Sequence, residues 1–206
     1  MSIQKAILSV LAIVLCASIA FAQEEKKDDD SKVQEVYRAF GVAMNAGVAG
    51  VLEFHITRWT TPEERQALIN AVVQNGEKNQ DKTVDMLRKQ PETGWTRTQS
   101  GAGMRGWPSV RLHYAYQFPQ EDGSRVVVLI TDRNIGMAEA MSASRSNDYQ
   151  VSGLVMQLKK GEDGKEKGSG TLFAAAKIGY NKEKNQVEIE SLGAQPVKLT
   201  DIRREK

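Results

Sequence analysis

The fold is decided by the hairpin sequence VRLHYAYQFPQEDGSRVVVLIT, which spans residues 110–131. In its first half apolar and polar residues alternate, and this period of two predicts a strand with one apolar face. The turn PQEDG follows, and the unbroken apolar run VVVLI then predicts a strand that is covered on both faces. The apolar face of the first strand is predicted to hold Val110, Leu112, Tyr114, Tyr116 and Phe118, and the opposite face Arg111, His113, Ala115 and Gln117.

Similar strand patterns flank this hairpin on both sides. Toward the C-terminus they predict strands at residues 150–159, 171–180, 186–192 and 197–203. Polar connections are predicted at 160–170 and 181–185, and a tight turn or bulge at 193–196. Toward the N-terminus, residues 33–46 fit a strand or a short helix, a turn is predicted at 45–50, and residues 51–59 fit a strand. In that last strand the predicted core face is Leu52, Phe54 and Ile56, and the other face is Glu53, His55 and Thr57.

Two helices are predicted between these strands and the hairpin. Thr61-Pro62-Glu63-Glu64 places a hydroxyl at the N-cap, proline at the first helical position and glutamate three residues after the cap. The hydroxyl and the glutamate can each bond a backbone amide of the other residue, which satisfies donors that the helix start leaves unpaired. The helix is predicted to end at Asn75-Gly76, and a second helix to span residues 80–89.

These elements predict one α+β domain at residues 33–206. We expect a mainly antiparallel, strongly bent sheet that forms a partial barrel or a sandwich, with the two helices inserted after the second strand. Sheets of this size close or stack to protect their edges.

The first 22 residues have the features of an export signal. Lys5 provides the positive charge, residues 6–17 are apolar, and small residues flank Phe21 at positions 20 and 22. Cleavage after Ala22 is predicted, which leaves about 184 residues, enough for one domain. An uncleaved anchor and a lipoprotein signal at Cys16 are the alternatives. The apolar run is shorter than the roughly 20 residues of a membrane helix, and Leu15 is not the small residue that a lipoprotein peptidase needs.

The mature chain is expected to start with a charged, flexible spacer at residues 23–32. It has no cysteine, because Cys16 is in the signal, and we expect no transmembrane segment in it. Its charges are nearly balanced, with 28 Lys and Arg against 26 Asp and Glu in the whole chain, and acids and bases are interspersed. A nucleic-acid-binding function, which needs a clustered basic face, is therefore not expected.

One group of candidate ligand-binding residues lies after the most apolar strand. Asp132 and Arg133 end this strand, and Glu139 lies in the following segment, which has no clear periodicity. Charges at the end of a buried strand can border a binding pocket, or they can form an ion pair that anchors the loop. We favour the ion pair. If the carboxylates of Asp132 and Glu139 converge, they fit the acid and base of a hydrolase.

Arg58 and Trp59, just before the capping box, are the second candidate group. An arginine beside an exposed tryptophan can recognise a ligand, but the tryptophan can also cover the junction of sheet and helix, which we favour.

Other signatures of catalysis or metal binding are weak. His55 and His113 are the only histidines, and without cysteine a structural zinc site lacks its usual ligands. The two histidines and a carboxylate fit a metal site if they meet across the sheet, but we favour ordinary surface positions and expect no metal or cofactor. No serine lies in a nucleophile-elbow context, and Ser100-Gly101-Ala102-Gly103 lacks the lysine of a phosphate loop.

Several short segments occur in an order that resembles a group of uncharacterised exported bacterial proteins. They are ITRWTTPEER at 56–65, Gly94-Trp95, VLITDR at 128–133, AKI at 176–178 and QPVKL at 195–199. The resemblance runs from about Leu52 to the C-terminus and implies a bacterial, exported, single-domain protein, but no functional residues. We therefore expect a non-enzymatic envelope protein, periplasmic or extracellular, that binds a small or lipid-like ligand or a partner protein. The alternative is the carboxylate hydrolase.

Overall fold

The computed structural model describes residues 29–43, 48–76, 79–99, 109–133, 151–191 and 196–206. The signal predicted at residues 1–22 lies outside these ranges, and so does most of the predicted spacer, whose last three residues form one turn of 3₁₀ helix. The described elements are η1 Asp30–Lys32, β1 Glu35–Ala43, β2 Val48–Ile56, α2 Pro62–Asn75, α3 Gln80–Lys89, β3 Gly94–Gln99, β4 Val110–Pro119, β5 Arg125–Thr131, β6 Val151–Lys160, β7 Glu166–Asn181, β8 Gln186–Ser191 and β9 Val197–Arg204.

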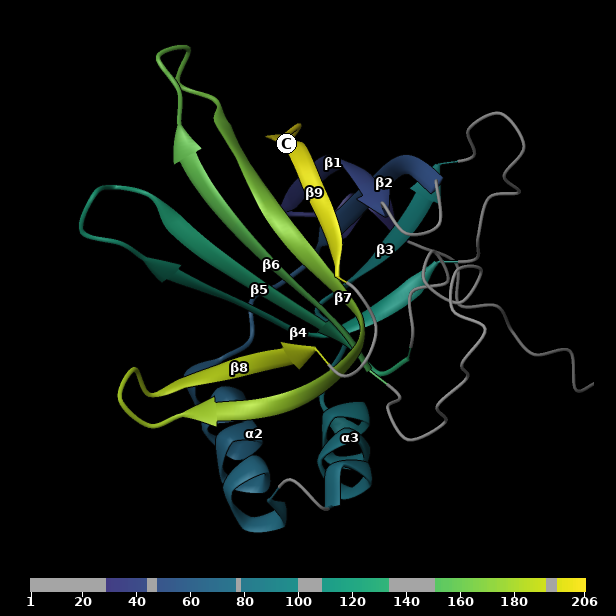
Figure 1. The fold of residues 1–206 in the computed structure, drawn as a ribbon, viewed down its shortest axis with the longest axis vertical. Coiled ribbons are helices and arrows are strands. Elements are labelled where there is room, and N and C mark those ends of the chain that lie inside the picture. Colours follow the sequence, from purple (N-terminus) through teal and green to yellow (C-terminus); the bar gives the residue numbers. More distant parts are fainter. Residues whose placement is uncertain (1–28, 44–47, 77–78, 100–108, 134–150, 192–195) are drawn as a thin grey trace, which may run out of the picture.

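Eight of these strands form a closed antiparallel barrel, with both helices inserted after β2 as predicted (Figure 1). Each strand from β1 to β6 pairs with the next one along the chain, β6 pairs with β7, and β9 lies between β7 and β1. The α+β class and the antiparallel sheet are confirmed, but the expected partial barrel or sandwich is corrected to a closed barrel. Pairing of β9 with β1 removes the two edges that a partial barrel would leave open.

The long strand β7 pairs with three strands, β6, β9 and β8. Its first part pairs with β9 inside the barrel wall, and its last part, Ala176 to Asn181, leaves the barrel and pairs with β8 (Figure 1). The connection is shorter than the predicted 160–170, because β7 already begins at Glu166. From Glu166 to Ala176, β7 pairs with β6. Gly168 permits this pairing, since a Cβ atom there would lie 1.9 Å from the Gln157 carbonyl oxygen.

The segment at residues 33–46 forms a strand, β1, rather than a helix, and β2 begins inside the turn that was predicted at 45–50.

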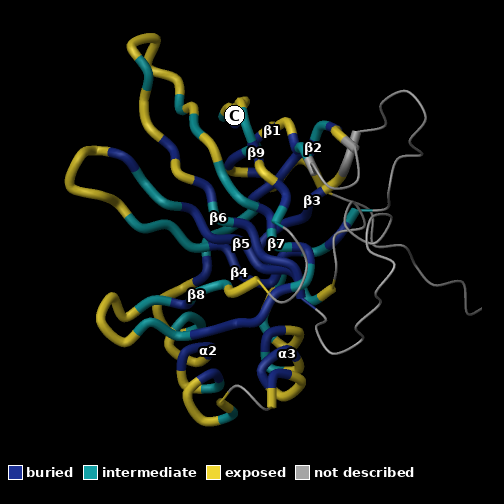
Figure 2. The backbone as a smooth tube through the Cα atoms, viewed as in Figure 1, coloured by how far each residue is buried: buried dark blue, intermediate teal, exposed yellow. Residues whose placement is uncertain are grey.

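Two hydrophobic cores lie on the two sides of the barrel wall, and both appear as buried segments in Figure 2. The first fills the barrel interior and draws side chains from seven of its eight strands. The second lies between the outer wall, the β7–β8 ribbon and the two helices. The largest interior side chains are Tyr37, Phe54, Leu52, Ile56, Leu112, Leu129, Leu154 and Met156. The outer core includes Leu68, Ile69, Val72, Val84, Leu87, Tyr114, Val128, Ile130, Val151 and Ile178.

The apolar run in β5 serves both cores, as the sequence predicts. Val127 and Leu129 belong to the interior core, and Val128 and Ile130 to the outer one. The faces predicted for β4 need a correction. Its register to β5 shifts between residues 112 and 114, so Leu112 lies in the interior whereas the tyrosines that follow lie outside. A one-residue bulge moves every later side chain to the opposite face.

Helix α3 attaches to the β7–β8 ribbon partly through a buried glutamine. The Gln80 side chain donates to the Ile178 carbonyl at 3.2 Å and accepts from the Ile178 amide at 3.0 Å, so it continues the backbone pairing of β7. Neither helix in the described part of the chain has the length and apolar character needed to span a membrane.

Candidate functional site

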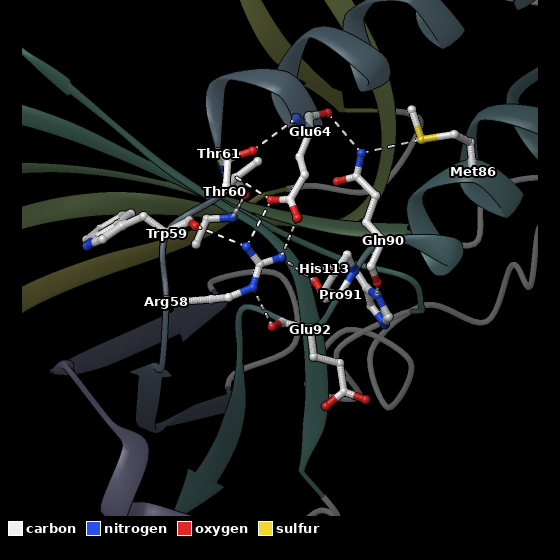
Figure 3. Close-up of polar contacts among 11 residues, drawn as sticks. Arg58, Trp59, Thr60, Thr61, Glu64, Met86, Gln90, Pro91, Glu92 and His113 are labelled. Carbon is white, nitrogen blue, oxygen red and sulfur yellow. Dashed lines mark hydrogen bonds and ion pairs between the residues drawn. The ribbon is translucent and has the colours of Figure 1, made fainter.

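Arg58 lies after β2 at the centre of a polar cluster (Figure 3). Its guanidinium donates two bonds to the Glu64 carboxylate, at 2.9 and 3.0 Å. It also donates to the carbonyl oxygens of Pro91, Glu92 and Trp59, at 3.0, 3.2 and 3.2 Å. These bonds engage all five N–H groups that a guanidinium has. Arg58 therefore joins the end of β2 to the first turn of α2 and to the linker between α3 and β3.

Trp59 is directed away from the Arg58 guanidinium (Figure 3). Its half-buried ring packs against the interior core, and its centroid lies 5.9 Å from the Cζ atom of Arg125. The two residues that the sequence singles out together thus face different surroundings.

Asp132 and Arg133 also have different partners. The Asp132 carboxylate lies 3.7 Å from the Arg88 guanidinium of α3 and 4.0 Å from Nε2 of His113, and Arg88 donates to the Asp132 carbonyl at 3.2 Å. The exposed Arg133 donates to the Ser109 carbonyl at 3.2 Å. Glu139 lies outside the described residues. The ligand rim and the hydrolase carboxylate pair therefore both stay predictions.

Both histidines are buried, which corrects the expected surface positions, and they have separate environments. His55 stacks on Trp95 with a centroid distance of 5.1 Å, and Nδ1 of His113 lies 3.2 Å from the Gln90 carbonyl oxygen. Within the described ranges, no three His, Cys, Asp or Glu side chains are grouped so that they could hold a metal ion.

A second polar cluster lies at one end of the barrel, and the sequence did not reveal it. Arg125 donates to the Glu166 carboxylate at 2.8 and 2.6 Å, to Glu35 at 3.1 Å, and to the Tyr37 hydroxyl. Tyr37 donates to Glu35. Arg204 completes the cluster, with guanidinium nitrogens 3.4 Å from the carboxylates of both Glu35 and Glu166. We call Glu35, Tyr37, Arg125, Glu166 and Arg204 the arginine–glutamate network.

Burial and charge pairing shape the protonation of this network. Burial raises the pKa of the Glu166 carboxyl, but the hydrogen bonds from Arg125 and the charge of Arg204 outweigh it, so the pKa is below its usual value. Burial, together with the hydrogen bond to Glu35, raises the pKa of Tyr37 well above the ordinary value. At neutral pH Glu166 is therefore a carboxylate and Tyr37 a neutral phenol, and both contact the Arg125 guanidinium.

An open groove with a volume of about 480 Å³ borders the network. Glu166 and Arg204 belong to both, and the groove also includes the turn between β6 and β7. The side chains of Lys160, Lys165 and Lys206 have no ion-pair partner among the described residues, although they line the groove. The lining residues are Lys160, Gly164, Lys165, Glu166, Arg204, Glu205 and Lys206.

The sequence contains only a faint signal of this site. Glu35, Arg125 and Glu166 begin their strands, and Arg204 ends β9. In an antiparallel barrel the starts of alternate strands meet at one end, so the charges converge there only once the strand order is known. Of these residues, Arg125 has the one local signal of a shielded charge, because it directly precedes the apolar run of β5.

Comparisons of this chain with protein-family models, with curated proteins and with solved structures gave no match.

Proposed function

We propose that the protein is a non-enzymatic binding protein of the bacterial envelope. In this proposal, the signal at residues 1–22 directs export and is cleaved after Ala22. The ligand, or a segment of a partner protein, then occupies the groove beside the arginine–glutamate network. The observation that carries the proposal is a set of three lysines that have no ion-pair partner among the described residues and that line a groove together with the ion-paired Glu166 and Arg204. The ion pairs of Arg204 fix this side chain before binding, so it adds little to the ordering cost, whereas the exposed lysines are ordered only when the ligand binds.

The protonation of Glu166 supports binding over acid–base catalysis. A general acid or base works best with a pKa near the operating pH. The pKa of Glu166 is instead lowered, and both arginines contact its carboxylate. The carboxylate thus holds the basic side chains in place.

A comparison of two lysine pairs tests the site. The protein is produced in an export-competent bacterial host, purified without denaturation and analysed by native mass spectrometry for a retained ligand. Lys160→Gln/Lys165→Gln should lose this ligand. The matched control is Lys182→Gln/Lys184→Gln, which removes the same charge from exposed positions in the β7–β8 turn. A ligand retained equally by both variants would place the binding site elsewhere.

Export has its own test. N-terminal sequencing of the protein recovered from the same host should give a chain that begins at Gln23, because Ala20 and Ala22 fit the small-residue pockets of a signal peptidase. A chain that still begins at Met1 and stays in the membrane fraction would contradict the proposal.

A further inference from the structure

We propose, on the basis of the function above, that the groove binds a hydrophilic anion that carries phosphate groups. The ammonium groups of Lys160, Lys165 and Lys206 would contact the phosphate oxygens, and Arg204 would supply a fixed positive charge in the lining of the groove.

The pairing of lysines on the β6–β7 hairpin is the first argument. Lys159 lies 3.6 Å from the Asp122 carboxylate, and Lys167 lies 2.8 Å from Asp163. Lys160 and Lys165 lie next to these positions in the same hairpin, yet neither pairs with a described carboxylate. The two ammonium groups that face the groove are thus the ones left available to an external anion.

The charge of the groove is the second argument. The described residues that line it include four basic side chains and two acidic ones, and one of the acids, Glu166, is already bound by Arg125. The Arg204 guanidinium is 37% exposed and is held by Glu35, Glu166 and the Lys206 carbonyl, to which Nε donates at 2.7 Å. Its position is therefore set before any ligand arrives. Lysine and arginine together are typical phosphate ligands, lysine as a point charge and arginine as a donor with fixed geometry.

The polarity of the groove is the third argument, and it favours a soluble anion over a membrane surface. Among the described residues that line the groove there is no apolar side chain, so an acyl chain or an aromatic ring would gain no burial against them. The exposed large hydrophobic side chains of the described chain, Phe40 and Val73, lie on β1 and α2 and not in the groove. Proteins that rest on membranes insert apolar side chains beside their basic ones.

The test uses inorganic tripolyphosphate as the soluble probe and vesicles as the membrane probe. Calorimetric titration of the full chain should show tripolyphosphate binding that weakens as salt is added. Lys160→Gln/Lys165→Gln should weaken it about tenfold or more, whereas Lys182→Gln/Lys184→Gln should change it less than about twofold. Sedimentation with phosphatidylglycerol vesicles should show no more binding than with phosphatidylcholine vesicles.

Three outcomes would overturn this inference. If both double variants weaken tripolyphosphate binding equally, the binding depends only on the net charge of the protein. Binding to phosphatidylglycerol vesicles alone would assign the lysines to a membrane surface. In the third outcome, the protein does not bind tripolyphosphate but retains an uncharged ligand, which only Lys160→Gln/Lys165→Gln loses. This result would exclude phosphate-containing ligands and leave the proposed binding function intact.

Discussion

At the scale of single residues, Glu166 belongs both to the arginine–glutamate network and to the lining of the groove. Its carboxylate accepts bonds from Arg125 and contacts Arg204, while its backbone begins β7. The side chain is 11% exposed, so solvent screens these pairs only in part. The same carboxylate therefore links the barrel wall to the groove.

Replacement of Glu166 by glutamine should lower the free energy of unfolding at pH 7 by about 2–3 kcal/mol, because it leaves the partly buried Arg125 with one charge partner fewer. The pKa of Glu166 lies below its ordinary value of 4.5, so its stabilising contribution is complete above that pH and is lost as the pH falls through the folded-state pKa. Urea unfolding of wild type and Glu166→Gln at pH 7 and pH 3.5 measures this difference, which should shrink at the lower pH. Glu205→Gln, an exposed neighbour in the groove, should show little change at either pH.

His55 should make stability depend on pH in a different range. Burial of the ring, aided by the nearby Arg97, lowers its pKa below the ordinary 6.5, although Glu53 and Asp30 oppose this with carboxylate oxygens at 3.5 and 4.0 Å. A histidine with a lowered pKa costs stability as the pH falls from 6.5 through the folded-state pKa. The free energy of unfolding of the wild type should therefore decrease between pH 7 and pH 5, and His55→Gln should show a flatter dependence. Parallel curves would contradict this role.

At the scale of elements, the start of α2 shows how local sequence and distant contacts combine. Thr61 Oγ1 accepts from the Glu64 amide at 3.3 Å, and the Glu64 carboxylate accepts from the Thr61 amide at 2.9 Å, so the predicted capping box is present. The same carboxylate also binds Arg58, whose other bonds extend to the α3–β3 linker. The cap is thus one part of a larger junction.

Thr61→Ala should lower the free energy of unfolding by about 1 kcal/mol, because the Glu64 amide loses its acceptor. Thr61→Ser keeps the hydroxyl and should stay close to the wild type. Chemical denaturation measures the effect, and the m-value should not change. Equal midpoints for wild type and the alanine variant would show that the threonine cap does not contribute to stability.

At the scale of the whole molecule, the closed barrel separates an interior core from an outer one. Phe54 of β2 is fully buried in the interior, whereas Phe40 of the neighbouring strand β1 is 43% exposed on the outside. Replacing each phenylalanine by alanine makes the same chemical change on opposite sides of the barrel wall.

Phe54→Ala should lower the free energy of unfolding by about 3–5 kcal/mol, because it removes buried apolar area and leaves a cavity. Phe40→Ala should cost less than about 1 kcal/mol, since its side chain is partly in water already. Thermal and urea unfolding of both variants measures the contrast, and equal losses would mean that Phe40 is covered in solution.

The sequence by itself determined the features that depend on neighbouring residues. Alternation in β2 and the apolar run of β5 reveal strands and their faces, and the capping box and terminal signals reveal α2 and α3. Each of these follows from side-chain periodicity or from hydrogen bonds within a few positions.

Tertiary structure alone decided how these elements combine. The bulge in β4 transfers Tyr114 to the outer core, and a stretch that is polar in sequence becomes the first part of β7 because its glycines allow close pairing with β6. Arg125 meets Glu35 and Glu166, which lie 90 and 41 positions away, only after the barrel has closed. Strand order and register are set by pairing and packing of the whole sheet, so no local pattern contains them.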